Sequence, residues 1–73
     1  MAVFHLECSV FRRTVSGIAV AHEHITARTE ADAIAEADTQ FTRLLAHRSG
    51  IAILRNDAGQ VIWTKRQTNE RAK

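Results

Sequence analysis

A single amphipathic segment, residues 29 to 48, constrains the fold of this chain more than any other feature. Thr29 can cap the N-terminus of a helix, and Asp32 stands where it can reach back to that cap. Acidic residues precede basic ones along the segment, which is the order that the helix dipole favours. Apolar residues recur at spacings of three and four, which predicts one buried stripe: Ile34, Ala37, Phe41, Leu44 and Leu45. Gly50 is expected to stop this helix.

The rest of the chain predicts four strands. Residues 2 to 11 alternate, and their uniformly apolar face consists of Phe4, Leu6, Cys8 and Val10. Residues 18 to 28 are rich in β-branched side chains and predict a second strand. Residues 51 to 55 and 60 to 66 predict a hairpin, because the intervening Asn-Asp-Ala-Gly suits a type I turn followed by a left-handed glycine.

These elements predict a single α+β domain over residues 1–66, in the order β-β-α-β-β. A four-stranded antiparallel sheet in the order 2-1-3-4, with one helix packed on one face, makes every neighbouring pair of strands antiparallel. It also places the first strand, which is apolar on both faces, in the middle. Residues 67–73 contain one alanine and otherwise polar side chains, so we expect a frayed basic C-terminal tail.

Composition and cysteine content narrow the class of protein. The chain has 73 residues, of which 45% are hydrophobic, and its 10 Lys and Arg against 8 Asp and Glu do not by themselves indicate a nucleic-acid partner. Cys8 is the lone cysteine, so no internal disulfide can form and a reducing compartment is expected. Neither a signal peptide nor a membrane span of about 18 apolar residues is apparent. We therefore expect a soluble cytoplasmic protein without membrane contact.

The sequence gives little support for a catalytic site. Cys8 alternates with core positions and is expected to be a small core side chain. The three glycines are scattered, so no phosphate-binding loop is formed, and the serines have no base at a motif spacing. A domain with one buried layer has little room for a deep pocket. We expect a non-enzymatic protein with no cofactor and no small-molecule substrate.

Three histidines and a glutamate converge if the first hairpin closes symmetrically around residues 12 to 17. In that register Glu7 faces His22, and His5 faces His24, all on the side away from the helix. Such a set could bind zinc or copper, but its spacing matches no recognised metal motif. We predict no metal site, with these four residues as weak candidates for one, and favour ordinary cross-strand pairs on a solvated face.

In the same register Glu23 points toward the helix side, opposite Leu6. An inward-facing charge on an edge strand is a known device against edge-to-edge aggregation. We interpret Glu23 in this way.

The sheet face away from the helix is expected to carry more apolar side chains than a solvent-exposed sheet face usually does. The second hairpin offers two apolar sets, Ala52/Leu54/Val61/Trp63 and Ile51/Ile53/Ile62, and only one of them can turn toward the helix. An antiparallel sheet with one wet face usually alternates more cleanly, so a partner should cover it. We predict a protein-interaction module, a homodimer or a complex with another protein, with the interface residues Val3, Phe11, Ile18, Val20 and Trp63.

Nucleic-acid binding is the alternative. Small sheets bind single strands through exposed aromatic side chains surrounded by cations, and the candidates here are Arg12, Arg13, Lys65 and Arg66. The competing interpretation is that the first two arginines lie in a turn and that Lys65 and Arg66 protect an edge strand.

The strand-strand-helix opening, residues 3 to 46, is similar in architecture to the sheet-and-helix half of HicB-type antitoxins. The DNA-binding helices attached to that half in the family have no counterpart in these residues. The resemblance therefore carries over no function and no residue.

Overall fold

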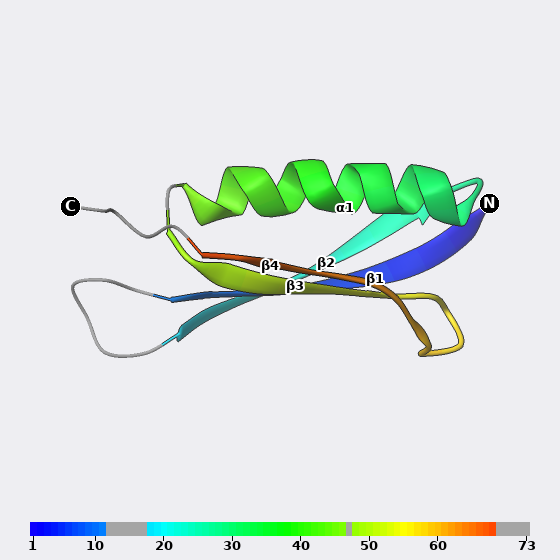
Figure 1. The fold of residues 1–73 in the computed structure, drawn as a ribbon. Coiled ribbons are helices and arrows are strands. Elements are labelled where there is room, and N and C mark those ends of the chain that lie inside the picture. Colours follow the sequence, from blue (N-terminus) through cyan, green and yellow to red (C-terminus); the bar gives the residue numbers. More distant parts are fainter. Residues whose placement is uncertain (12–17, 47, 69–73) are drawn as a thin grey trace.

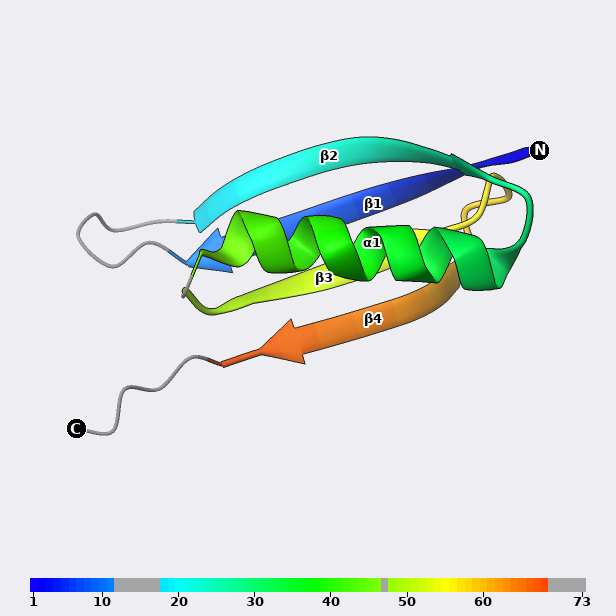
Figure 2. The same cartoon turned by 90° about the horizontal axis from the view of Figure 1, so that it is seen from above.

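One helix lies across one face of a four-stranded antiparallel sheet in the computed structural model, which describes residues 1–11, 18–46 and 48–68 (Figure 1). The elements are β1 (Ala2–Phe11), β2 (Ile18–Ala27), α1 (Glu30–Leu45), β3 (Gly50–Arg55) and β4 (Val61–Gln67). The strand order is β2-β1-β3-β4, as predicted, so β2 and β4 are the edges. Figure 2 shows α1 running along the middle of the sheet. Within the described residues, no helix has both the length and the apolar character needed to cross a membrane.

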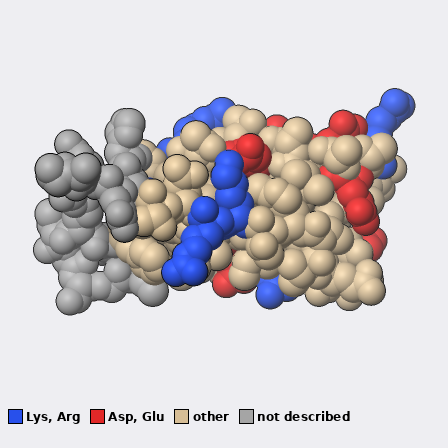
Figure 3. All heavy atoms as spheres, viewed as in Figure 1, with Lys and Arg blue, Asp and Glu red and all other residues tan. Residues whose placement is uncertain are grey.

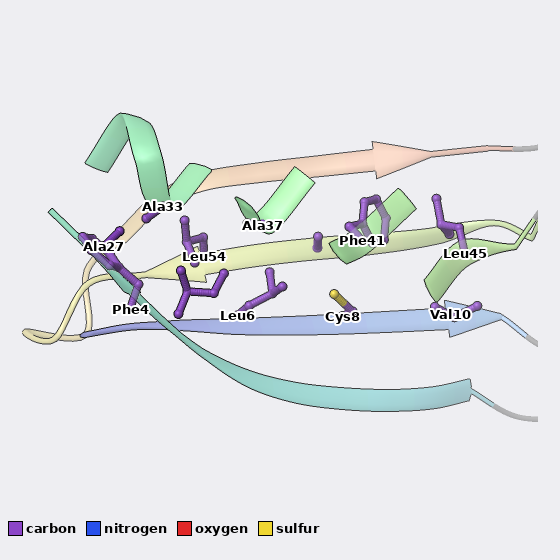
Figure 4. Close-up of a cluster of buried hydrophobic side chains, with 12 residues drawn as sticks. Phe4, Leu6, Cys8, Val10, Ala27, Ala33, Ala37, Phe41, Leu45 and Leu54 are labelled. Atoms are coloured by element: carbon purple, nitrogen blue, oxygen red, sulfur yellow. The ribbon is translucent and has the colours of Figure 1, made fainter. Parts of the chain in front are cut away.

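The first hairpin has the predicted register. Its pairs run without interruption from Ala2 opposite Ala27 to Phe11 opposite Ile18. Burial alternates along β1, and the predicted core face, Phe4, Leu6, Cys8 and Val10, is buried. Figure 4 shows these side chains directed from β1 toward α1. A slip of one residue would turn all of them to the opposite face, so their burial specifies the register.

The start of α1 is confirmed, and its buried stripe is shifted by one position at the N-terminal end. The Thr29 hydroxyl oxygen accepts a hydrogen bond from the backbone N–H of Asp32 at 3.1 Å. The fully buried positions are spaced by four: Ala33, Ala37, Phe41 and Leu45. Ile34 and Leu44, which we expected in the stripe, are partly buried at its margins. Small alanines on the buried line let the helix backbone lie close to the sheet, which large side chains would prevent.

The end of α1 corrects the prediction of a helix that reaches residue 48 and stops at Gly50. The helix ends at Leu45, because Ala46 adopts the left-handed conformation with φ 47° and ψ 52°. The Arg48 guanidinium donates hydrogen bonds to the carbonyl oxygens of Leu44 and Leu45, each at 3.0 Å. The last carbonyls are therefore satisfied before the glycine is reached. Gly50 is instead the first residue of β3.

The turn of the second hairpin is built around Asn56. Its carbonyl oxygen accepts the N–H of Gly59 at 3.0 Å, and Gly59 has the expected positive φ of 85°. The side-chain oxygen of Asn56 accepts from the N–H groups of Ala58 and Gln60 at 3.0 and 2.9 Å. The asparagine side chain thus satisfies the turn's own backbone donors.

A bulge in β4 divides one of the two apolar sets expected in this hairpin. Leu54 pairs with Trp63, but Arg55 pairs with Val61, so Ile62 is the extra residue. Trp63 therefore lies on the helix side, where it packs partly buried against the core. Val61 lies on the other face with Arg55.

Candidate interaction face of the sheet

The open face, by which we mean the sheet surface that α1 leaves uncovered, carries almost all the exposed large hydrophobic side chains. No described element lies over it (Figure 1). Apart from Met1, the exposed large hydrophobic residues of the described chain are Val3 at 41%, Phe11 at 38%, Val20 at 52% and Val61 at 52%. The strand register places all four on the open face. On the helix side the apolar side chains are buried in the core, whereas on the open face large apolar side chains are left exposed by the described elements.

One end of the open face is largely apolar, with Arg66 of β4 beside it. Phe11 stands opposite Ile18, and Ser9 stands between Val20 on β2 and Ile51 on β3. Ile51 is partly buried, and the side chain of Ile18 lies outside the described residues. Four of the five predicted interface positions, Val3, Phe11, Ile18 and Val20, thus fall on this face by register.

The fifth predicted interface residue, Trp63, does not lie on the open face. It stands opposite Leu54, which is fully buried beneath α1. The β4 bulge brings Val61 onto the open face, where sequence reasoning did not place it. Trp63 lies on the helix side because the set that it shares with Ala52 and Leu54 faces α1. Simple alternation along β4 gives no sign of the extra residue that separates Val61 from this set.

Polar side chains lie in the middle of the open face beside Ile53, which stands opposite Glu7, and we call them the polar centre: His5, Glu7, His22, His24 and Arg55. The predicted cross-strand pairs are present, with His5 opposite His24 and Glu7 opposite His22. The rings of His5 and His24 pack edge to face, with their centroids 4.9 Å apart and an angle of 86° between the planes. Arg55 Nη1 donates to Glu7 Oε1 at 3.1 Å.

The polar centre does not converge on a metal position. The Glu7 carboxylate is paired with a guanidinium, and two of the imidazoles pack against each other. In the part of the chain that the structure describes, no group of three or more His, Cys, Asp and Glu side chains could hold a metal ion. The four weak candidates share one face, as the register requires, without forming a ligand set.

Of the four proposed nucleic-acid residues, the two that the structure describes, Lys65 and Arg66, lie on opposite faces of the sheet. Arg12 and Arg13 lie outside the described residues. Lys65 stands opposite Ala52 on the helix side and binds the Asp38 carboxylate at 2.6 Å, whereas Arg66 is exposed on the open face. Figure 3 shows basic side chains separated by neutral surface and lying beside acidic ones, not a continuous basic patch.

Two hollows follow the groove between β2 and α1, and sequence reasoning did not indicate them. One, of about 440 Å³, is lined by His24, Ile25, Asp32 and Glu36 among others, and the second, of about 330 Å³, by Glu23, Gln40, Arg43 and Leu44. No polar or charged side chain of the described residues is buried. Neither hollow therefore contains the desolvated ionisable group that marks many catalytic sites.

Cys8, the remaining candidate nucleophile, belongs to the core. Burial raises the pKa of its thiol, and the carboxylates of Glu23 and Glu7 raise it further. A raised pKa keeps the sulfur in its unreactive thiol form at neutral pH.

Comparison with known proteins adds no relative: no protein-family model, no curated protein and no solved structure matches the chain significantly. The surface chemistry of the fold is therefore the basis for assigning a function.

Proposed function

We propose that this protein is a small, non-enzymatic protein-interaction module that forms a homodimer through its open face. The observation that carries the proposal is the gathering of Val3, Phe11, Val20 and Val61 on the uncovered side of the sheet. Burying such side chains is the main favourable contribution to protein association. A domain of 73 residues has a small core, and a second sheet stacked about 10 Å away would enlarge it. The lone cysteine fits a reducing, cytoplasmic setting.

The pattern of the open face is self-complementary, which favours a second copy over a different partner. Phe11 and Val20 lie at one end and Val3 lies at the other, with the polar centre between them, and Val61 stands beside the polar centre on the edge strand, opposite Arg55. A two-fold axis between stacked sheets runs either along the strands or across them. We propose the axis across the strands, because it lays β2 against β2, so that the polar centre meets the polar centre and the two ends of the face meet each other, whereas an axis along the strands would lay β2 against β4.

Charge is compatible with the same arrangement. The strand positions on the open face carry three charged residues, Glu7, Arg55 and Arg66. Glu7 and Arg55 neutralise each other within one protomer at 3.1 Å. A second copy therefore meets little uncompensated charge, and no strongly charged partner is needed to balance the face.

The size of the face is adequate for a dimer. Strands about 4.8 Å apart with a rise of about 3.3 Å per residue give a four-stranded face roughly 20 Å wide and 20 to 30 Å long. Its projection is on the order of 500 Å², and side-chain relief raises the accessible area toward the roughly 800 Å² that each partner buries in a standard interface.

The oligomeric state in solution tests the proposal. We expect a dimer by sedimentation equilibrium and light scattering at pH 8. Val20→Lys together with Val61→Lys should give a monomer that remains folded, because both residues are exposed and unpaired lysines at an interface oppose association. Ala35→Lys with Thr42→Lys is the matched control, since these exposed positions lie on α1. A wild type that is monomeric at high concentration, or a lysine pair in the sheet that leaves the dimer intact, would refute this interface.

Nucleic-acid binding is distinguished by its response to salt. Phosphate contacts weaken steeply as salt is added, whereas an apolar sheet interface does not. A mobility shift with single-stranded DNA or RNA at low salt, lost in Lys65→Ala with Arg66→Ala, would favour that alternative. Under the proposed function we expect no shift.

A further inference from the structure

We propose that self-association through the open face is sensitive to pH, and that the histidines of the polar centre are the sensing groups. The inference rests on the proposed homodimer and adds a regulation of the same surface. It starts from the cluster His5, His22 and His24, of which two rings pack edge to face with centroids 4.9 Å apart.

The surroundings of these imidazoles supply little negative charge. Glu7 is the single acidic residue at the strand positions of the open face, and Arg55 already binds it at 3.1 Å. His5 stands between His24 on β2 and Arg55 on β3, and His22 stands opposite Glu7. The remaining charged residue of the face is Arg66, at the end that contains Ile51. Protons taken up here would therefore meet the Arg55 guanidinium and one carboxylate that is already paired.

Dimerisation moves these imidazoles from water into a protein interface. A two-fold axis that runs across the strands lays β2 of one protomer against β2 of the other and brings the polar centre of one protomer against that of the other, so the imidazoles leave water and come close together. Neutral imidazoles tolerate this, because they donate and accept hydrogen bonds and pack as flat rings. Protonated imidazoles do not, since burial and like charges both disfavour the charged form.

The direction of the effect follows. Histidine ordinarily changes charge between about pH 5 and pH 8. Protons bind more readily to the separated protomers than to the dimer, so a falling pH favours the monomer. We expect the dimer dissociation constant to be at least about tenfold larger at pH 5.5 than at pH 8. A factor of ten is the change in affinity that corresponds to a difference of one pKa unit in a single group between monomer and dimer.

Sedimentation equilibrium on the wild type across this pH range tests the inference, with a triple variant His5→Gln, His22→Gln and His24→Gln. Glutamine keeps a polar side chain but takes up no proton, so the triple variant should dimerise with the same constant at both pH values. Thr26→Gln with Thr64→Gln is the control, because these exposed residues lie on the same face outside the polar centre. The control should retain the wild-type pH dependence.

Each outcome has a separate meaning. A wild-type dimer whose dissociation constant does not change between pH 8 and pH 5.5 overturns the pH inference and leaves the homodimer standing. A wild type that is monomeric at every pH overturns the homodimer itself. A triple variant that keeps the wild-type pH dependence shows that other groups sense the proton. If the triple variant does not fold, calorimetric dilution of the wild type in buffers of different ionisation enthalpy decides, because the inference requires net proton uptake on dissociation.

Discussion

Gly50 lies so close to Ser9 that a Cβ atom at position 50 would stand 2.6 Å from the Ser9 carbonyl oxygen and 2.9 Å from Leu45 Cδ2. The glycine is where β3 begins, opposite Val10 of the central strand and beneath the end of α1. Both neighbours belong to the packed frame, so neither can move freely. The absence of a side chain at this position therefore permits the helix and two strands to approach one another.

Gly50→Ala should destabilise the fold by about 1–3 kcal/mol, the usual effect of forcing an extra carbon into a packed site. Urea denaturation followed by circular dichroism measures the change. A variant as stable as the wild type would show that β1 and the end of α1 can separate at this point without loss.

Ala46→Gly should have the opposite effect. Ala46 is exposed and holds a left-handed conformation with φ 47°, which costs an L-residue with a Cβ atom roughly 1–2 kcal/mol and glycine much less. We expect a gain of about 1 kcal/mol in the free energy of unfolding. Ala35→Gly, at an exposed position within α1, is the control and should lose about 1 kcal/mol. Two losses of similar size would mean that the helix does not end at Leu45.

Gly50 and Ala46 show why the end of the helix could not be predicted from the sequence. A glycine after an amphipathic segment is the usual sign of a helix stop, and Gly50 was interpreted in that way. The structure uses an alanine for the left-handed turn and the Arg48 side chain for the last carbonyls. The sequence contains no local signal for this choice, because the glycine is required by a contact with β1 that is distant in the chain.

The sheet was predictable where alternation is unbroken. In β1 a one-residue slip would expose Leu6 and Val10, and the observed hairpin register follows from that constraint. In β4 the bulge at Ile62 changes the face of every residue before it, so Val61 and Trp63 were assigned together although they lie on opposite faces. The open face itself, and four of its five predicted residues, followed from counting elements: one helix cannot cover two faces.

Phe41 is the largest fully buried side chain of the described residues, and its removal should test the core. We expect Phe41→Ala to lower the free energy of unfolding by about 3–5 kcal/mol, a large share of the stability of a small domain. Thr42→Ala, at the neighbouring exposed position, should change stability by less than about 0.5 kcal/mol. Thermal melts of the two variants give the comparison. Equal melting temperatures would contradict the placement of α1 on the sheet.

Glu23 provides the last prediction, which concerns the free edge of β2. It stands opposite Leu6 on the helix side of the edge strand, yet it is exposed beside Gln40 and Arg43. A charge in this position hinders a second strand from pairing with the edge, because pairing would bring the carboxylate against another chain. Replacing it with threonine, a good strand former, removes the charge and keeps a side chain suited to β2.

Glu23→Thr should therefore promote edge-to-edge association. The variant is best made together with Val3→Lys and Phe11→Lys, which are exposed open-face positions of the central strand β1, so that stacking through the open face cannot account for the result and no lysine is added to the β2 edge. We expect light scattering to show slow growth of species larger than the monomer, with added β-structure by circular dichroism, while the lysine parent stays monomeric. Glu36→Gln in the same parent removes an equal charge from α1 and should not associate. If both variants associate alike, the loss of a carboxylate from the surface and not the β2 edge is the cause; if neither does, Glu23 does not guard the edge.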